Sequence, residues 1–180
     1  MKKELHEEIK VKEGVSIQLD GSTLKVKGAK GEIQRDFLHP QVKLIIENNK
    51  IILTANRNTK KEKKMLSSFA AHIENMLKGV TEPFTYKLKI CSGHFPMNVA
   101  VSGDELIIKN FLGESVPRKI KIIPGAQVKV NGNEIEIIST NKEIAGQTAA
   151  RIENSCRITN RDIRIFQDGC YITHKAGKNI

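Results

Sequence analysis

Residues 17–26 read IQLDGSTLKV, and residues 99–108 read VAVSGDELII, at an offset of 82 positions (17 to 99). In both segments, apolar residues occupy alternate positions on either side of a glycine. This spacing is typical of two antiparallel strands joined by a tight turn, with one face buried and the other exposed to solvent. Its recurrence indicates an internal duplication of the chain.

Further matches between the two halves support this duplication, with the offset shifting slightly where turns change length. They pair Gly31–Glu32 with Gly113–Glu114, Ile51–Leu53 with Ile135–Ile137, Thr59 and Glu62 with Thr140 and Glu143, and Ile73–Asn75 with Ile152–Asn154. We therefore predict an α+β protein of two tandem duplicated domains, each a small antiparallel sheet covered by one α-helix. Pro83 marks the boundary, so the domains are residues 1–83 and 84–180.

The first copy is predicted to contain short strands between Glu8 and Thr54, including a second hairpin around Asn48-Asn49. A capping box formed by Thr59 and Glu62 predicts the start of a helix of about four turns. An apolar stripe follows at helical spacing. Gly79 stands where a helix end would use a left-handed residue, so we expect the helix to stop there.

The second copy carries an additional segment after its helix. Thr140 and Glu143 predict a capping box and a helix starting near Asn141. Its buried stripe is Ile144, Thr148, Ile152 and Cys156. Arg157, Arg161 and Arg164 follow within eight residues, and Asp168-Gly169 predicts a hairpin turn before Tyr171.

The chain has 30 Lys and Arg against 20 Asp and Glu, a net charge of +10 that favours an anionic partner. Each half carries about half of this excess, but the residue types differ: residues 1–83 contain 14 Lys and two Arg, and residues 84–180 contain nine Lys and five Arg. Arginine presents a planar fork to phosphate, whereas lysine presents a point charge. The second half is therefore better suited to phosphate recognition.

Metal, cofactor and membrane functions are not indicated. Cys91, Cys156 and Cys170 lack a Cys-x-x-Cys spacing, so we expect three small buried apolar residues rather than a zinc or disulfide site. The five histidines are scattered. No apolar run approaches the roughly 20 residues that span a bilayer, and the N-terminal residues lack the apolar core of a signal peptide, so we expect a cytoplasmic protein.

No catalytic constellation is present in the sequence, since nucleophile-elbow, Walker and dinucleotide-binding patterns are missing. Gly28-Ala29-Lys30-Gly31 has the spacing of a KH-domain phosphate loop, but here it joins two predicted strands rather than two helices. Lys60, Lys61, Lys63 and Lys64 gather at a helix start, where the dipole disfavours cations. They form either an exposed face or a phosphate contact. With 4% aromatic residues and no Trp, an extensive base-stacking platform is not expected.

Four ordered motifs resemble one family over about residues 8–176. They are SGHFPMNV (Ser92 to Val99), IKNFLGE (Ile108 to Glu114), GQTAARIE (Gly146 to Glu153) and RIFQDGCY (Arg164 to Tyr171). The chain is similar to the universal large-subunit ribosomal protein family called L six in bacteria and L nine in eukaryotes, in its archaeal and eukaryotic branch. Cys170 stands where that family usually has an aliphatic residue, and the Gly- and Lys-rich tail of the bacterial branch is missing.

The resemblance implies a structural constituent of the large ribosomal subunit that binds 23S-type rRNA, mainly through the second domain. It places the protein near the stalk base and the sarcin-ricin region, beside neighbouring ribosomal proteins and translation factors, without catalysis, cofactor or small-molecule substrate. On this reading Lys142, Gly146 and Gln147 approach phosphates through backbone amides at the start of the second helix. The expected charged contacts are Arg118, Lys119, Arg157, Arg161, Arg164, Lys175 and Lys178.

Two alternatives remain open at this point. A free-standing KH-like single-strand RNA-binding module would use the loop from Gly28 to Gly31, and its first domain alone would bind oligonucleotides. A basic protein-binding adaptor would ignore RNA and retain an acidic partner.

Overall fold

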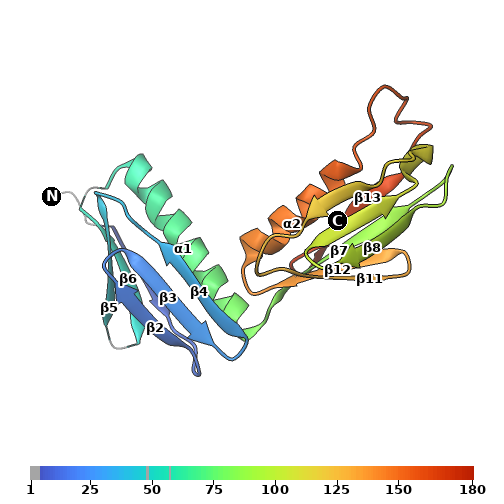
Figure 1. Cartoon of the computed structure of the whole chain (residues 1–180). Coiled ribbons are helices and arrows are strands. Elements are labelled where there is room, and N and C mark those ends of the chain that lie inside the picture. Colours follow the sequence, from blue (N-terminus) through green and yellow to red (C-terminus); the bar gives the residue numbers. More distant parts are fainter. Residues whose placement is uncertain (1–4, 48, 57) are drawn as a thin grey trace. The chain divides into compact units, whose positions relative to one another are not determined.

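The computed structural model describes residues 5–47, 49–56 and 58–180. The chain forms two compact units, which we call the N-terminal unit (residues 1–83) and the C-terminal unit (residues 84–180) (Figure 1). Among the described residues, no helix is long and apolar enough to cross a membrane.

The described residues of the N-terminal unit form six strands and one helix. They are β1 (Leu5–Lys10), β2 (Ser16–Asp20), β3 (Thr23–Gly28), β4 (Gly31–Asp36), β5 (Val42–Glu47), β6 (Lys50–Ala55) and α1 (Lys60–Thr81). The strands form two antiparallel three-stranded sheets, β1-β6-β5 and β2-β3-β4. The predicted hairpin from residue 42 to residue 54 is present as β5 and β6, although Asn48 lies outside the described residues.

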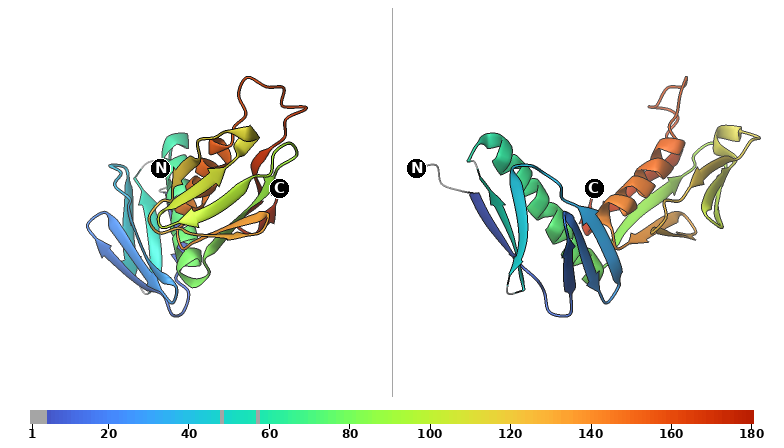
Figure 2. Two further views of the ribbon diagram at one scale, coloured as in Figure 1. Left: turned by 45° about the vertical axis from the view of Figure 1, so that its right-hand side comes forward. Right: turned by 60° about the vertical axis from the view of Figure 1, so that its left-hand side comes forward.

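The N-terminal core lies between α1 and both sheets (Figure 2). Val26 of β3, Leu53 of β6 and Ile73 of α1 are fully buried. Burying each such aliphatic side chain contributes about 1.5–3 kcal/mol. One helix therefore covers the apolar faces of two small sheets.

The C-terminal unit contains eight strands, one α-helix and a short 3₁₀ turn. They are β7 (Phe84–Cys91), β8 (Asn98–Ser102), β9 (Glu105–Lys109), η1 (Phe111–Gly113), β10 (Arg118–Lys121), β11 (Gln127–Asn131), β12 (Glu134–Ser139), α2 (Lys142–Ser155), β13 (Gly169–Lys175) and β14 (Lys178–Asn179). They form the sheets β10-β9-β8 and β11-β12-β7-β13-β14. Leu88, Ile135 and Ile152 are fully buried in the core beneath α2.

The strand order confirms the predicted duplication. The order β1-β6-β5 corresponds to β7-β12-β11, and the meander β2-β3-β4 corresponds to β8-β9-β10. The C-terminal unit adds β13 and β14 along the edge of β7 that does not pair with β12. Each unit has two sheets rather than the single sheet that we expected, because the strand before each meander pairs with the strand before the helix.

The predicted helix ends need correction. α1 runs for 22 residues, well beyond four turns, and Gly79 is buried inside it while Glu82 is the C-cap. Gly79 therefore lies on the buried face of the helix, and the helix ends just before Pro83, which cannot continue it. Neither predicted capping box forms as expected. Thr59 is the N-cap of α1 but makes no side-chain cap hydrogen bond within the described residues. In α2 the N-cap is Asn141, whose Oδ1 accepts the Glu143 N–H at 2.9 Å.

The predicted hairpin at Asp168-Gly169 is wrong. The segment before it is a loop, residues 157–168, and not a strand. Gly169 begins β13, whose partner is β7. The hairpin lies further on, between β13 and β14. The Asp-Gly pair instead marks the place where the loop enters the sheet.

Candidate nucleic-acid interface

The loop of residues 157–168, which we call the arginine loop, leaves the end of α2 and returns to the sheet as β13. Arg157, Arg161 and Arg164 all lie on it and all are exposed. A surface loop with three exposed guanidinium groups is suited to contact a polyanion, because phosphates accept charge-assisted hydrogen bonds from them.

Asp168 fixes the end of the arginine loop. Only 2% of this residue is exposed, and its carboxylate accepts hydrogen bonds from the Gly93 N–H and from His94 Nδ1, the latter at 2.9 Å. Burial opposes ionisation, but the Gly93 amide and His94 outweigh it, so the pKa of Asp168 is lowered. The carboxylate thus joins the loop after β7 to the arginine loop.

Three side chains stack above this anchor. The rings of His94 and Phe166 lie 4.5 Å apart between centroids with 25° between their planes. The guanidinium carbon of Arg161 lies 4.8 Å from the Phe166 centroid. These contacts support an arginine side chain on the arginine loop.

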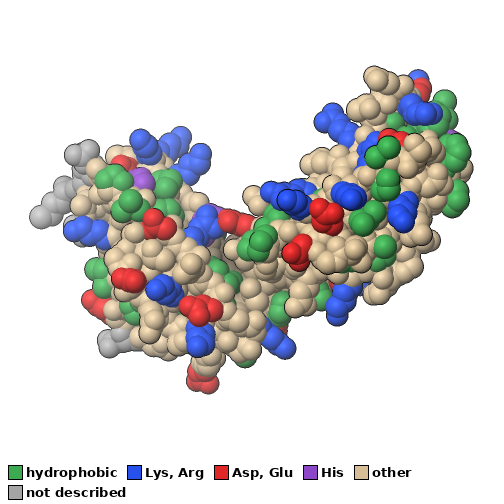
Figure 3. All heavy atoms as spheres, viewed as in Figure 1, with side chains coloured by type: hydrophobic (Ala, Val, Ile, Leu, Met, Phe, Trp, Pro, Cys, Tyr) green, Lys and Arg blue, Asp and Glu red, His purple; other side chains and the backbone are tan. Residues whose placement is uncertain are grey.

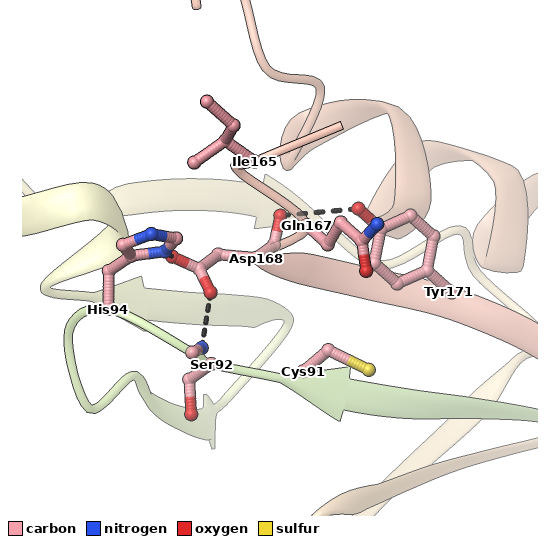
Figure 4. A pocket seen from close by; sticks show the side chains of 8 residues that line it. Cys91, Ser92, His94, Ile165, Gln167, Asp168 and Tyr171 are labelled. Carbon is pink, nitrogen blue, oxygen red and sulfur yellow. Dashed lines mark hydrogen bonds and ion pairs between the residues drawn. The ribbon is translucent and has the colours of Figure 1, made fainter. Parts of the chain in front are cut away.

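A hollow of about 680 Å³ lies beside the anchor (Figure 4). Its walls come from the segment Cys91–His94 and from Ile165, Gln167, Asp168 and Tyr171. These residues belong to two of the motifs that carried the family resemblance, SGHFPMNV and RIFQDGCY, apart from Cys91, which directly precedes the first. The structure therefore brings together motifs that are about 70 residues apart in the chain (His94 to Arg164).

Arg164 forms a local ion pair. Its guanidinium donates to Asp162 Oδ2 at 2.7 Å, which raises the pKa of Arg164 and lowers that of Asp162. The side chain of Arg164 is 86% exposed, so water screens the pair and phosphate can compete for the guanidinium.

Arg118 and Lys119 on β10 have different surroundings. The Arg118 guanidinium donates to the Glu114 carboxylate and to the Ser155 carbonyl in the last turn of α2, and it lies 4.2 Å from the Phe111 centroid. It therefore supports the C-terminal end of α2, where carbonyl groups lack helical partners and cations are favoured. Lys119 is exposed.

Lys142, Gly146 and Gln147 lie at the opposite end of α2. Lys142 Nζ is 5.9 Å from the Phe84 centroid, and a Cβ at Gly146 would lie 3.3 Å from the Tyr86 hydroxyl. Gly146 and Gln147 follow the first turn, where backbone N–H groups already bond within the helix. The expected contact between a backbone amide and a phosphate therefore fits Lys142 alone of these three residues. Gln147 instead exposes its side chain to solvent.

Lys175 and Lys178 pair across the β13–β14 hairpin, and Lys175 is also the register partner of Tyr86. They therefore lie at the end of the sheet near Lys142, about 20 Å along β13 from the arginine loop. The predicted contacts form two groups at the two ends of α2. One comprises Arg118, Lys119, Arg157, Arg161 and Arg164; the other comprises Lys142, Gly146, Gln147, Lys175 and Lys178.

The cysteines are packing residues with one exception. Cys156 and Cys170 are buried free thiols, and hydrogen bonding to Cys156 together with burial raises the pKa of Cys170. Cys91 is only half-buried and lines the hollow, contrary to our expectation. No group of three or more His, Cys, Asp or Glu side chains in the described part of the chain could hold a metal ion.

The sequence did not identify His94, Phe166 and Asp168, whose contacts connect the arginine loop to the segment after β7. His94 was one scattered histidine among five, and Asp168 was assigned to a turn. The motifs that contain them were visible, but the contact between the motifs was not.

These features define a duplicated α+β protein with a basic C-terminal surface. The sequence profile of the family described as ribosomal protein L6 matches residues 11–83 and 95–169. The chain is 44% identical to the large ribosomal subunit protein uL6 of Methanococcus vannielii, over 97% of this chain and 96% of that protein. It is also 44% identical to the uL6 protein of Methanosarcina mazei, over 98% of this chain and all of that protein. The chain therefore belongs to the ribosomal protein L6 family, whose members are structural proteins and not enzymes.

Proposed function

We propose that this protein is a structural constituent of the large ribosomal subunit in the cytoplasm and that it binds large-subunit rRNA mainly through its C-terminal unit. The observation that carries the proposal is the arginine loop, which presents three exposed arginines on a support fixed by the buried carboxylate of Asp168. Family membership supports the ribosomal setting.

A folded RNA helix presents phosphates and 2′-hydroxyls rather than readable base edges, so basic loops and small polar groups suit it. The two groups of contacts are separated by the length of α2, about 21 Å for 14 residues. This separation allows the unit to contact two neighbouring stretches of RNA backbone. Figure 3 shows Lys and Arg side chains on the face of the C-terminal unit that is in view, with a smaller number of Asp and Glu side chains among them.

We further propose a position near the stalk base and the sarcin-ricin region, where neighbouring ribosomal proteins and translation factors meet the subunit. This position rests on the resemblance of the four motifs to the archaeal and eukaryotic branch of the family.

The surroundings of the loop from Gly28 to Gly31 do not favour the KH-like alternative, which would need that loop to bind RNA. Gly28 and Gly31 flank the turn between two strands, β3 and β4, and the Lys30 N–H donates to the Val80 carbonyl at 3.0 Å. A Cβ at Gly28 would lie 2.8 Å from that same carbonyl oxygen. The glycine is thus explained by close packing of the turn on α1.

The test is sedimentation of the tagged full-length chain with large ribosomal subunits through a high-salt wash. The proposal predicts that the chain stays with the large subunit and that the purified chain also binds protein-free large-subunit rRNA. A chain that leaves the subunit in salt and ignores naked rRNA, while it retains an acidic protein, would support the adaptor alternative instead.

A further inference from the structure

The stack of His94, Phe166 and Arg161 ends in an exposed guanidinium group. We propose that Arg161 is a stacking platform for one unpaired nucleobase of the rRNA, with His94 and Asp168 as the residues that position it. This inference rests on the proposed function, and it specifies what one side chain of the arginine loop recognises.

Both His94 and Arg161 contact the ring of Phe166. The His94 ring stacks on it at 4.5 Å and 25°, and the carbon of the Arg161 guanidinium lies over it, 4.8 Å from its centroid. The ring behind Arg161 restrains its long side chain before binding, so less rotamer entropy remains to be lost on contact. Unpaired RNA bases stack on aromatic rings and on arginine planes.

The buried carboxylate of Asp168 holds His94, the side chain that stacks on Phe166. His94 Nδ1 is 2.9 Å from Asp168 Oδ2, and Asp168 is buried and also accepts the Gly93 N–H. These contacts to Phe166 are therefore attached to the sheet through Asp168, which directly precedes β13. A base that stacks on Arg161 would therefore contact a guanidinium group that is positioned before the RNA binds.

Arg161 differs in this respect from the other two arginines of the loop. Within the described residues, Arg164 is paired with Asp162, and Arg157 has no aromatic ring within cation–π distance, whereas Arg161 has a ring behind it and no carboxylate partner. A low aromatic content excludes a long stacking groove, but it does not limit a site for one base. Stacking also leaves the N–H edges of the guanidinium free for a phosphate oxygen.

The experiment separates stacking from charge. Full-length protein is titrated with large-subunit rRNA of the source organism at several salt concentrations, using Arg161→Lys and Arg161→Ala, with Arg157→Lys and Arg164→Lys as matched controls. We expect Arg161→Lys to weaken binding about tenfold, with an unchanged salt slope because the charge is retained. The two control substitutions should change affinity by less than about twofold.

A base-level readout accompanies the titration. Chemical probing of the bound rRNA should show one unpaired base that is protected by the wild type and exposed with Arg161→Lys, while the backbone footprint stays the same. His94→Ala should weaken binding with the salt slope unchanged, and His94→Phe, which keeps a ring beneath Phe166, should restore part of the loss.

Several results would overturn the inference while leaving the proposed function intact. Wild-type affinity in Arg161→Lys, combined with lower affinity and a smaller salt slope in Arg161→Ala, would show a phosphate contact only. Wild-type affinity in Arg161→Ala would show that this residue does not touch the RNA. A defect seen on assembled subunits but not on naked rRNA would show that Arg161 stacks on a protein. Failure of the wild type itself to bind rRNA would instead contradict the proposed function.

Discussion

Asp168 is a charged residue at a position where the sequence suggests a simple turn. In the structure it joins the arginine loop to Gly93 and His94. Its carboxylate is buried and receives the Gly93 amide and His94. A buried charge is stable only when such partners replace the lost hydration. The residue therefore acts as the fixed point at which the arginine loop returns to the sheet.

We predict that Asp168→Ala lowers the free energy of unfolding by about 1–3 kcal/mol, because it removes the charged acceptor of the Gly93 N–H and of His94. Chemical denaturation measures this loss. Since the pKa of Asp168 is lowered in the folded state, its contribution is complete above the unfolded pKa of about 4 and disappears as the pH falls through the folded value. The stability difference between wild type and variant should therefore shrink as the pH falls below about 4. A difference that grows on acidification would contradict the anchoring role.

At the residue scale, the sequence could indicate which side chains carry charge but not which of them contact each other. The spacing of Arg157, Arg161 and Arg164 predicts an exposed basic segment, and all three are exposed. The partner of Asp168 could not be predicted, because Gly93 and His94 are about 75 residues away and no local pattern encodes that contact. Gly79 was misassigned for a related reason, since in sequence a buried glycine inside a helix looks like a glycine that ends one.

At the element scale, α2 connects both groups of predicted contacts. Its buried face includes Ala145 and Ala149, whose small side chains let the helix lie close to the sheet. It also helps to hold β13, because Glu153 Oε1 accepts the Ile172 N–H at 3.0 Å where the β13–β7 register shifts. Arg118 supports the end of the helix from which the arginine loop begins.

Arg118 and Lys119 are neighbours on β10 and should respond differently to substitution. We predict that Arg118→Met lowers the free energy of unfolding by about 1–2 kcal/mol, because the Ser155 carbonyl and the Phe111 ring lose their cation. Lys119→Met should leave stability within about 0.5 kcal/mol and reduce the salt slope of rRNA binding by about one. Thermal unfolding and a salt titration measure the two effects. Equal stability losses in both variants would argue against a helix-supporting role specific to Arg118.

The elements themselves were largely predictable from periodicity. Alternation identified the strands, and apolar spacing identified both helices, because these periods follow from backbone geometry. Pairing between distant strands was not predictable: β1 pairs with β6, and β13 pairs with β7. This long-range pairing divides each unit into two sheets and inserts β13 where a hairpin was expected.

At the scale of the whole molecule, one α+β unit is present twice, and its second copy has been extended. The strand orders correspond, and β13 with β14 is the addition. The arginine loop lies in that addition, between α2 and β13. We therefore propose that residues 84–180 form the main rRNA-binding domain, while residues 1–83 contribute more diffuse positive charge through lysines such as Lys60 and Lys63.

The most direct measurement compares charge removal in the two units of the full-length chain. One variant carries Gln at Arg157, Arg161 and Arg164, and the matched variant carries Gln at Lys60, Lys61 and Lys63, which are also exposed. Binding to large-subunit rRNA is then measured across a salt series. Our account predicts that the arginine variant loses at least tenfold in affinity and about two to three units of salt slope, whereas the lysine variant changes slope by less than one. The opposite pattern, or equal effects from both variants, would contradict the assignment of rRNA binding to the C-terminal unit.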